Sequence, residues 1–431
     1  MDNRELALYC IENIKARGAH KASCSINYSK NYEFNYSESG MDLLRTTIDT
    51  NVGFLAIKDN KLGSLGLNKL DKITIDEKID ELMDICNSAE ADPCNDISDY
   101  QPKETFSCGP KEPNLDKLYD LIKNFMVKMK KEFPKVRIMD GTACGNFVTN
   151  EIDYVNTNGV EFKIHNSIYT MSIGYLAKEG EKSSSFDIVG YNFCEIPEDF
   201  MEFQDVRQRL EDITKQIECN NIGEKFVGDV ILTPAVVADM VMMYDMTFLG
   251  DEPLIMGTSI LKDKLNEKVA SDKFTLMFKP VGEEIVNKNF VTGDGFKSEN
   301  LTIIENGVLK SFDLSLYGAK KTGKTPSKTL ANIVIKPGSI SKADIIKSVE
   351  RGIVLGRFSG GSPSNNGDFS GVAKNSFYIE NGEIKYPLVE TMITSNLYEM
   401  FNSIEAISCE VIESGDSVIP WIKVKAVNIS G

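Results

Sequence analysis

Several strand-like segments follow one another between residues 135 and 193 with no helical pattern between them. They are KVRIMDG, EIDYVNTNGVEFKIH, SIYTMSIGYLA and SSFDIVGYNF, and Asn158-Gly159 marks a tight hairpin turn. Parallel strands need long crossover connections, so strands this close in sequence predict antiparallel pairing. The expected fold class is therefore α+β, with two domains of mostly antiparallel sheets flanked by helices and a C-terminal domain rich in strands.

Three helical patterns precede these strands. Apolar residues recur at helical spacing from Leu6 to Ile14, and a second helix is expected to open with a capping box formed by Thr74 and Glu77. A third helix is expected from Leu115 to Phe133, because Pro134 ends its apolar stripe.

Turn-forming residues divide the chain. Prolines and a glycine concentrate in residues 90–113, which predicts a connecting loop between subdomains 1–100 and 113–222. The polar stretch NNIGEK marks the main boundary. We therefore expect an N-terminal α+β domain at 1–222 and a C-terminal domain rich in strands at 223–431, a division that fits a chain of 431 residues.

Histidine is nearly absent. The chain holds only His20 and His165, too far apart to share a helix, and each is expected to be structural or solvent-facing. Histidine is the usual ligand of catalytic zinc and the usual general base at neutral pH. Few routes to hydrolysis remain, and hydrolysis at a non-metal site would need the fold to bring a nucleophile to one of these two residues.

Charge and cysteine usage narrow the partners and the compartment. The formal charge of -16 opposes direct binding to nucleic acid. Nine scattered cysteines without a C-x-x-C pair favour a reducing compartment. The first ten residues resemble no signal peptide, and no apolar run is long enough to cross a membrane. We expect a cytoplasmic protein that binds neither nucleic acid nor membrane.

Three further segments allow more than one interpretation. The glycine-rich run Gly356–Gly371 lacks the Lys and the following helix of a phosphate-binding loop, so it is either a flexible connector or a loop that approaches a ligand or partner. Residues 303–309 and 378–384 share Ile-Glu-Asn-Gly, which indicates two hairpins or an internal duplication. Four lysines between Lys320 and Lys328 predict a solvated loop or a contact with an acidic partner.

A set of motifs spread over the whole chain resembles the TldD/PmbA family. The clearest are GRFSGG at 356–361, NGDFSG at 366–371 and YIENGEI at 378–384 with Pro387. Glu90-Ala91-Asp92-Pro93, the strand VILTP at 230–234 and GTSILKDKL at 257–265 occur in the family's order. By this resemblance, residues 223–431 correspond to the family's metalloprotease-like domain.

The resemblance also locates a missing metal motif. The family's catalytic type carries His-Glu-x-x-x-His on the helix after the VILTP-like strand, and a cysteine near the C-terminus completes the zinc site. Here Met242, Met243 and Thr247 stand at those positions. Thioethers are soft ligands with poor affinity for zinc, and Met243 has no carboxylate to activate water. We therefore expect no metal, no cofactor and no catalytic residues at this degenerate motif.

The other residues of this region have plainer expected roles. The methionines and aromatic residues from Met240 to Phe248 predict a buried helix. Asp239 and Asp245 lie six residues apart, so they should be surface charges on different faces. Cys409 is expected to be buried, because the family's ligand position falls closer to 414–416.

The resemblance is strongest to the family's non-catalytic type, called TldE or PmbA. That type pairs with a zinc-bearing TldD-like subunit in a cytoplasmic protease that cleaves unfolded peptides, and whether this chain is an enzyme by itself stays open. Strand addition would hold such peptides with little sequence demand. The candidate residues that face peptide or partner are Gly356, Gly360, Gly361, Gly367, Asp368 and Gly371. The alternative is a homo-oligomeric, for instance homodimeric, peptide-binding or scaffold protein without protease activity. The family's older description as a modulator of DNA gyrase implies contact with a DNA enzyme, not with DNA.

Overall fold

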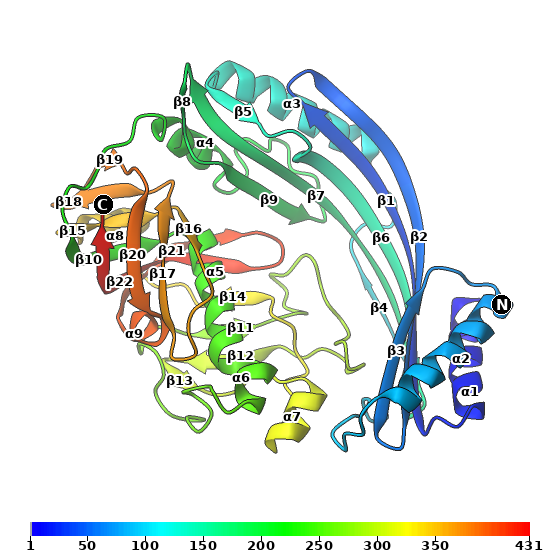
Figure 1. The fold of residues 1–431 in the computed structure, drawn as a ribbon. Coiled ribbons are helices and arrows are strands. Elements are labelled where there is room, and N and C mark those ends of the chain that lie inside the picture. Colours follow the sequence, from blue (N-terminus) through cyan, green and yellow to red (C-terminus); the bar gives the residue numbers. More distant parts are fainter. Residues whose placement is uncertain (1) are drawn as a thin grey trace.

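The computed structural model describes residues 2–431 and confirms the α+β class. Two mixed sheets account for the architecture, one built from strands before residue 194 and the other from strands after residue 225 (Figure 1). Pairing is antiparallel except between β4 and β7, β10 and β15, and β14 and β22. No helix within residues 2–431 is long and apolar enough to cross a lipid bilayer.

The first sheet has the strand order β3-β2-β1-β6-β7-β4, with β5, β8 and β9 paired to β7. Its four longest strands arch over the C-terminal half of the molecule (Figure 1). Because β1 pairs with β6 over fourteen residues, the two expected subdomains contribute to one continuous sheet. The strands are β1 Lys21–Ser37, β2 Gly40–Lys58, β3 Lys61–Leu67, β4 Glu104–Cys108, β5 Val136–Ile138, β6 Ala143–Asn156, β7 Glu161–Glu179, β8 Lys182–Ser183 and β9 Asp187–Phe193.

Four helices cover this sheet at two places. Apolar residues of the first two helices form one buried cluster with β1 and β2, and those of the other two form a second cluster with β6, β7 and β9. The helices are α1 Asn3–Ala16, α2 Lys72–Ser88, α3 Leu115–Glu132 and α4 Val206–Lys215. The third predicted helix is confirmed, but the capping box is wrong: Asp71 caps α2 by accepting from the Thr74 amide. A carboxylate is as good a cap as a hydroxyl, so the helix begins one residue after Asp71.

The second sheet has the order β13-β12-β11-β14-β22-β10-β15-β18-β19, and β16, β17, β20 and β21 join it away from this path. Its strands are β10 Phe226–Leu232, β11 Leu276–Phe278, β12 Leu301–Glu305, β13 Val308–Leu309, β14 Ile333–Ile335, β15 Arg351–Leu355, β16 Arg357–Gly360, β17 Asp368–Lys374, β18 Phe377–Glu380, β19 Glu383–Pro387, β20 Thr391–Asn396, β21 Ile404–Glu413 and β22 Val418–Ser430. Its helical segments are α5 Pro234–Tyr244, η1 Asp245–Leu249, α6 Asp251–Ile255, α7 Leu316–Thr322, α8 Lys342–Lys347 and α9 Leu397–Asn402.

The repeated Ile-Glu-Asn-Gly sequence forms two hairpins. Asn306 and Asn381 take positive φ angles, as do the glycines that follow them, which is the geometry of the tight hairpin turn expected from Asn-Gly. The hairpins are β12–β13 and β18–β19, and they form the two ends of the long path through the second sheet. The same four residues therefore make the same turn at both ends.

The glycine-rich run also contains regular structure. Its two ends form the antiparallel pair β16 and β17, in which Gly360 faces Gly371, and only the residues between these strands form a loop. A side chain at either of these facing positions would overlap its neighbours. A Cβ atom on Gly371 would lie 2.4 Å from the ring of Phe358 and 2.8 Å from Cα of Gly360. The interpretation as a flexible connector is therefore wrong for both ends of the run.

Candidate functional site

The helix after the VILTP strand contains an irregular turn. Thr233 is the N-cap residue of α5 and Pro234 occupies its first turn, where a missing N–H costs nothing. At Asp245 the helix changes to a π-helical turn, in which the amide of Gly250 donates to the carbonyl of Asp245 at 3.0 Å. Such turns widen the helix locally and recur at functional sites.

This turn brings the three predicted motif positions, Met242, Met243 and Thr247, to one place. In a regular α-helix, residues five apart are about 140° apart around the axis. The π-helical turn follows an i to i+5 pattern, so Met242 and Thr247 instead face the same space. Both residues, together with Met243, line one cavity of about 700 Å³.

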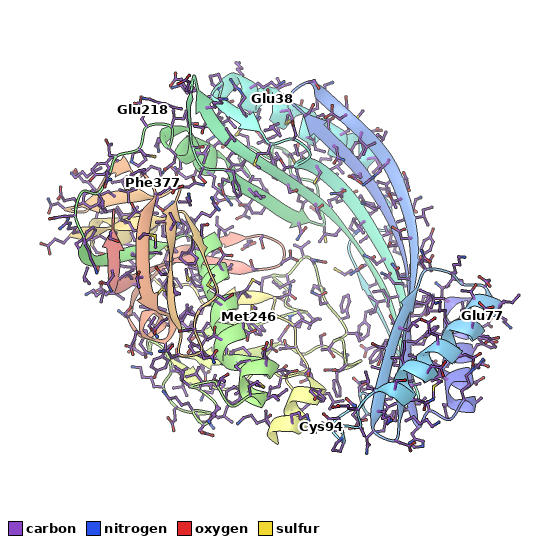
Figure 2. All side chains as sticks on the ribbon, viewed as in Figure 1. Glu38, Glu77, Cys94, Glu218, Met246 and Phe377 are labelled. Carbon is purple, nitrogen blue, oxygen red and sulfur yellow. The ribbon has the colours of Figure 1, made fainter. Side chains whose placement is uncertain are left out.

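The cavity is lined mainly by methionines and by the glycine-rich loop. Its walls come from α5, η1, α6 and the loop between β16 and β17, and Figure 2 shows Met246 on the helical segment in the middle of the molecule. The lining residues are Asp239, Met242, Met243, Met246, Thr247, Glu252, Pro253, Met256, Thr258, Gly360, Gly361, Ser362, Pro363 and Asn365. Two of the six loop candidates, Gly360 and Gly361, thus lie at the degenerate motif.

The donor atoms of this cavity do not fit zinc. Thioethers are soft ligands that favour Cu(I), whereas zinc sites use imidazole, thiolate or carboxylate groups. Within residues 2–431, His, Cys, Asp and Glu nowhere form a group of three that could hold a metal ion. Asp239 and Glu252 supply the only carboxylates of the lining, so the site lacks the three protein ligands of a catalytic zinc ion.

Three of the cavity's methionines are largely exposed. Met242 is 54% exposed, and Met246 and Met256 are each 71% exposed, whereas Met240, Tyr244 and Phe248 are buried. The prediction of a fully buried helix is therefore wrong for Met242 and Met246. A group of large apolar side chains that are exposed side by side is typical of a binding surface. The flexible methionine side chain can also adapt its shape to different partners.

Comparisons with known proteins relate this chain to one protein family. Residues 226–431 match the family model described as the PmbA/TldA metallopeptidase C-terminal domain. An uncharacterized protein of Methanocaldococcus jannaschii is 24% identical over 413 residues, which cover 91% of this chain and 92% of the relative. The chain belongs to the TldD/PmbA family.

Other relatives of this TldD/PmbA chain carry metalloprotease names. The zinc metalloprotease TldD homolog of Saccharolobus solfataricus is 26% identical over 232 residues, covering 42% of this chain and 52% of the relative. Metalloprotease PmbA of Escherichia coli O157:H7 is 27% identical over 176 residues, covering 39% of each. This chain spans about half of the first of these relatives and 39% of the second, so their names establish no protease activity for this chain.

Solved structures share the fold of this TldD/PmbA chain over nearly its whole length. A structure described as a modulator of DNA gyrase, from Bacteroides thetaiotaomicron, has a TM-score of 0.86 at 22% identity and covers 100% of this chain and 99% of that one. TldE from Thermococcus kodakarensis has a TM-score of 0.81 at 19% identity and covers 99% of each chain.

The remaining loop candidates of the TldD/PmbA chain lie outside the methionine-lined cavity. Gly356 lines a different cavity. Gly367 has a φ of +94° and packs against Phe248, so a Cβ atom there would lie 2.8 Å from that ring. Asp368 accepts from the side-chain amides of Asn366 and Asn396. Gly371 packs against Phe358. Gly367, Asp368 and Gly371 therefore shape the β16–β17 hairpin, whereas Gly356 lies at the junction of β15 and β16.

Residues missed by sequence reasoning come from two other segments. Glu252 and Met256 follow the π-helical turn, and Ser362, Pro363 and Asn365 belong to the loop between β16 and β17. Periodicity gives no signal for them, because α6 is only five residues long and the loop has no repeat. The only usable signal is the excess of methionine over one short stretch.

The histidines and Cys409 lie away from this cavity. The side chains of His20 and His165 are exposed, and the nearest carboxylates are Asp59 at 3.9 Å and Glu151 at 4.0 Å. Cys409 is also exposed, so the prediction of its burial is wrong. The pairing of β21 with β22 is interrupted between Ile407 and Val411, where β21 has two more residues than β22, and Cys409 lies in this bulged, exposed stretch.

The lysine cluster lies on and after α7 and is partly paired within the chain. Lys321 forms an ion pair of 2.6 Å with Asp92, and Lys320 pairs with Asp96. Hydrogen bonds from Lys321, the Cys94 amide and Tyr317 lower the pKa of Asp92 to about 2. Asp92 belongs to the Glu-Ala-Asp-Pro motif, so this motif joins the segment after α2 to α7. Lys320 and Lys321 are not free for an acidic partner.

Asp245 is partly buried at the start of the π-helical turn, whereas Asp239 is exposed. Its Oδ1 atom is sealed from solvent and has no hydrogen-bond partner within residues 2–431. Burial, and in addition the neighbouring Asp313 carboxylate, raise the pKa of Asp245 well above its usual value. The prediction of a surface charge is therefore wrong for Asp245.

We expect Asp245→Asn to raise the free energy of unfolding at neutral pH by about 1–2 kcal/mol. The folded state binds the proton of Asp245 more tightly than the unfolded chain, so stability falls as the pH rises from about 4 through the raised pKa. The asparagine variant lacks this fall. Urea unfolding should show its advantage at pH 7 and none at pH 4. The exposed Asp263→Asn is the control of equal charge change, and a variant less stable than the parent at pH 7 would contradict the argument.

Proposed function

We propose that this chain is a TldE/PmbA-type subunit, free of zinc and inactive alone, of a cytoplasmic metalloprotease. In this proposal it holds unfolded peptides for a zinc-bearing TldD-like partner. The observation that carries the proposal is the methionine-lined cavity, which holds Met242, Met243 and Thr247. By the family resemblance, these three residues stand in place of the two histidines and the glutamate of the catalytic type.

The exposed thioethers support a role in peptide binding. An unfolded peptide offers apolar side chains in no fixed order, so a surface that binds many peptides benefits from flexible, polarizable side chains. Met242, Met246 and Met256 provide such a surface beside the short loop between β16 and β17. A cytoplasmic location agrees with nine cysteines that are all free in the structure.

The first test separates this function from catalysis by the chain alone. The purified chain should hold less than about 0.1 zinc per molecule and cleave no unfolded peptide. Mixing it with a TldD-like chain of the same genome that retains His-Glu-x-x-x-His should give a particle with the summed mass and peptide cleavage. Stoichiometric zinc with turnover by the isolated chain would overturn the proposal. An unchanged mass on mixing would favour the homo-oligomeric scaffold instead.

A variant of the cavity sharpens this test. Met246→Arg places a charge among the thioethers and should raise the KM for peptide by about tenfold, because about 1.4 kcal/mol of apolar contact is lost. The mass of the mixed particle should stay the same. Met41→Arg, at another exposed methionine, is the matched control. Equal KM values for the two variants would argue against peptide binding at this cavity.

A further inference from the structure

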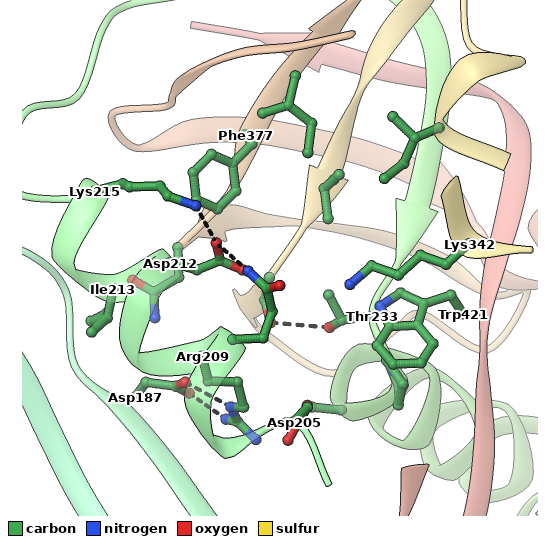
Figure 3. Close-up of a pocket in the computed structure, with 18 residues that line it drawn as sticks. Asp187, Asp205, Arg209, Asp212, Ile213, Lys215, Thr233, Lys342, Phe377 and Trp421 are labelled. Carbon is green, nitrogen blue, oxygen red and sulfur yellow. Dashed lines mark hydrogen bonds and ion pairs between the residues drawn. The ribbon is translucent and has the colours of Figure 1, made fainter. Parts of the chain in front are cut away.

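A second cavity, of about 290 Å³, lies between the two halves of the chain (Figure 3). One side is formed by α4 and the start of β9, and the other by strands of the second sheet together with the start of α5 and α8. No lining residue is shared with the methionine-lined cavity. Its size falls at the lower end of the range for small-molecule pockets.

Aromatic side chains form two walls of this second cavity. Trp421 is 7% exposed and Phe377 is 6% exposed, so both rings present only one face or edge to the cavity. In Figure 3 the two residues lie on opposite sides of the space, with Lys215 beside Phe377. A flat apolar group would contact both rings while excluding water.

The carboxylates that line the cavity already have partners. Asp187 receives two hydrogen bonds from Arg209, at 2.6 and 2.9 Å, and Asp205 accepts from the hydroxyl of Tyr191. Asp212 forms an ion pair of 3.0 Å with Lys215. These groups therefore offer little free negative charge to a ligand.

Lys342 supplies a positive charge to the lining of this cavity. Its ammonium lies 4.5 Å from the centre of the Trp421 ring, a cation–π distance, and forms no ion pair within residues 2–431. The nearby carboxylate of Glu410 accepts from the backbone amide of Lys342 at 2.8 Å. Figure 3 shows the Lys342 side chain extending toward the space in front of Trp421.

The first turn of α5 adds to the same positive field. The Thr233 hydroxyl donates to the carbonyl of Gly356 at 3.2 Å and makes no capping hydrogen bond to the helix. Ala235, whose amide belongs to this uncapped turn, lines the cavity. Uncapped amides at a helix start favour a negative group.

We propose that this second cavity binds a small organic acid with an aromatic or similarly flat apolar body. The carboxylate lies at Lys342, and the apolar body packs between Trp421 and Phe377. A C-terminal phenylalanine of a peptide offers the same chemistry as a free aryl acid. The site is independent of peptide binding at the methionine-lined cavity, so neither result decides the other.

The chain provides its own reporter, because Trp421 is its only tryptophan. Excitation at the red edge of the indole band, where a phenyl ring does not absorb, selects the emission of Trp421, and this emission reports on this cavity alone. Titration of the full chain with 3-phenylpropionate should give a saturable change in emission with a Kd below about 1 mM. The neutral 3-phenylpropionamide should bind at least about tenfold more weakly, because it lacks the charge. Absence of saturation, or equal affinity for acid and amide, would overturn the proposal.

A variant pair locates the carboxylate. Lys342→Met keeps the length of the side chain and should weaken binding of the acid about tenfold in calorimetry, which does not depend on the indole. Lys347→Met lies on the same helix but is exposed and paired with Asp344, so it should bind like the parent. Equal loss in both variants, or none in Lys342→Met, would refute the assignment.

Gly-Gly-Phe and Gly-Gly-Phe amide then distinguish a free acid from a peptide terminus. Binding of 3-phenylpropionate without binding of Gly-Gly-Phe assigns the free acid. Binding of both 3-phenylpropionate and Gly-Gly-Phe, with rejection of Gly-Gly-Phe amide, assigns the shared carboxylate chemistry.

Discussion

Lys423→Ala is expected to lower the free energy of unfolding by about 3–5 kcal/mol. The Lys423 side chain is 3% exposed, and its ammonium lies 3.0 Å from Asp229 and 2.7 Å from Glu405. It also donates to the carbonyl and the hydroxyl of Ser348. Removing the ammonium leaves the Asp229 carboxylate without a cation and leaves Glu405 with only the exposed Lys425, and this uncompensated charge is the main cost.

Lys425→Ala is the matched control for this prediction. Lys425 lies two residues further along β22 and pairs with the same Glu405, but its side chain is 52% exposed. An exposed ion pair contributes about 1 kcal/mol or less. Guanidinium unfolding curves of both variants should therefore separate clearly. Equal midpoints for the two alanine variants would show that the Lys423 network is solvated. Lys423→Met keeps the apolar stem of the side chain, and it should lose nearly as much stability as Lys423→Ala.

Gly356→Ala is expected to cost about 3 kcal/mol, although it adds a single methyl group. A Cβ atom at this position would lie 2.0 Å from the carbonyl oxygen of Asn375 and 2.9 Å from its carbonyl carbon. Both atoms belong to backbone just before β18, so a change of rotamer cannot relieve the contact. The junction between β15 and β16 has to move.

Gly361→Ala provides the contrast within the same glycine-rich run. Nothing lies within 4 Å of a Cβ atom built at Gly361, and its φ angle is not positive. We expect a change of less than about 0.5 kcal/mol for this surface position. Thermal unfolding of the two variants measures the difference directly. A Gly356 variant as stable as the Gly361 variant would mean that the β15–β16 junction is free to shift.

Local patterns predict much of this fold. The apolar stripe of α3 and the proline after it define that helix to within one residue, and Asn306-Gly307 and Asn381-Gly382 form the expected hairpins. These features depend on neighbours in sequence. The union of β1 with β6 in one sheet depends instead on strands separated by more than a hundred residues, for which periodicity carries no signal.

The candidate site likewise has features that the local sequence predicts and features that depend on the folded structure. The resemblance around VILTP predicts Met242, Met243 and Thr247 as the motif positions from the sequence alone, but their common direction depends on the π-helical turn. A period of 3.6 residues predicts buried methionines there, whereas Met242 and Met246 are exposed. The bulged stretch that contains Cys409 is likewise a property of strand pairing.

Strand β22 pairs with β10, β14, β20 and β21, and in the second sheet it alone connects the part that contains β11–β14 to the part that contains β10 and β15. Leu232 finds its partner Ile422 only after almost the whole domain has been synthesised. Until then, the edges of β10 and β14 are open to any other strand. Because non-local pairing of this kind slows folding, the newly made chain spends an extended time exposed to aggregation, and chaperones should be most needed while β22 is still missing.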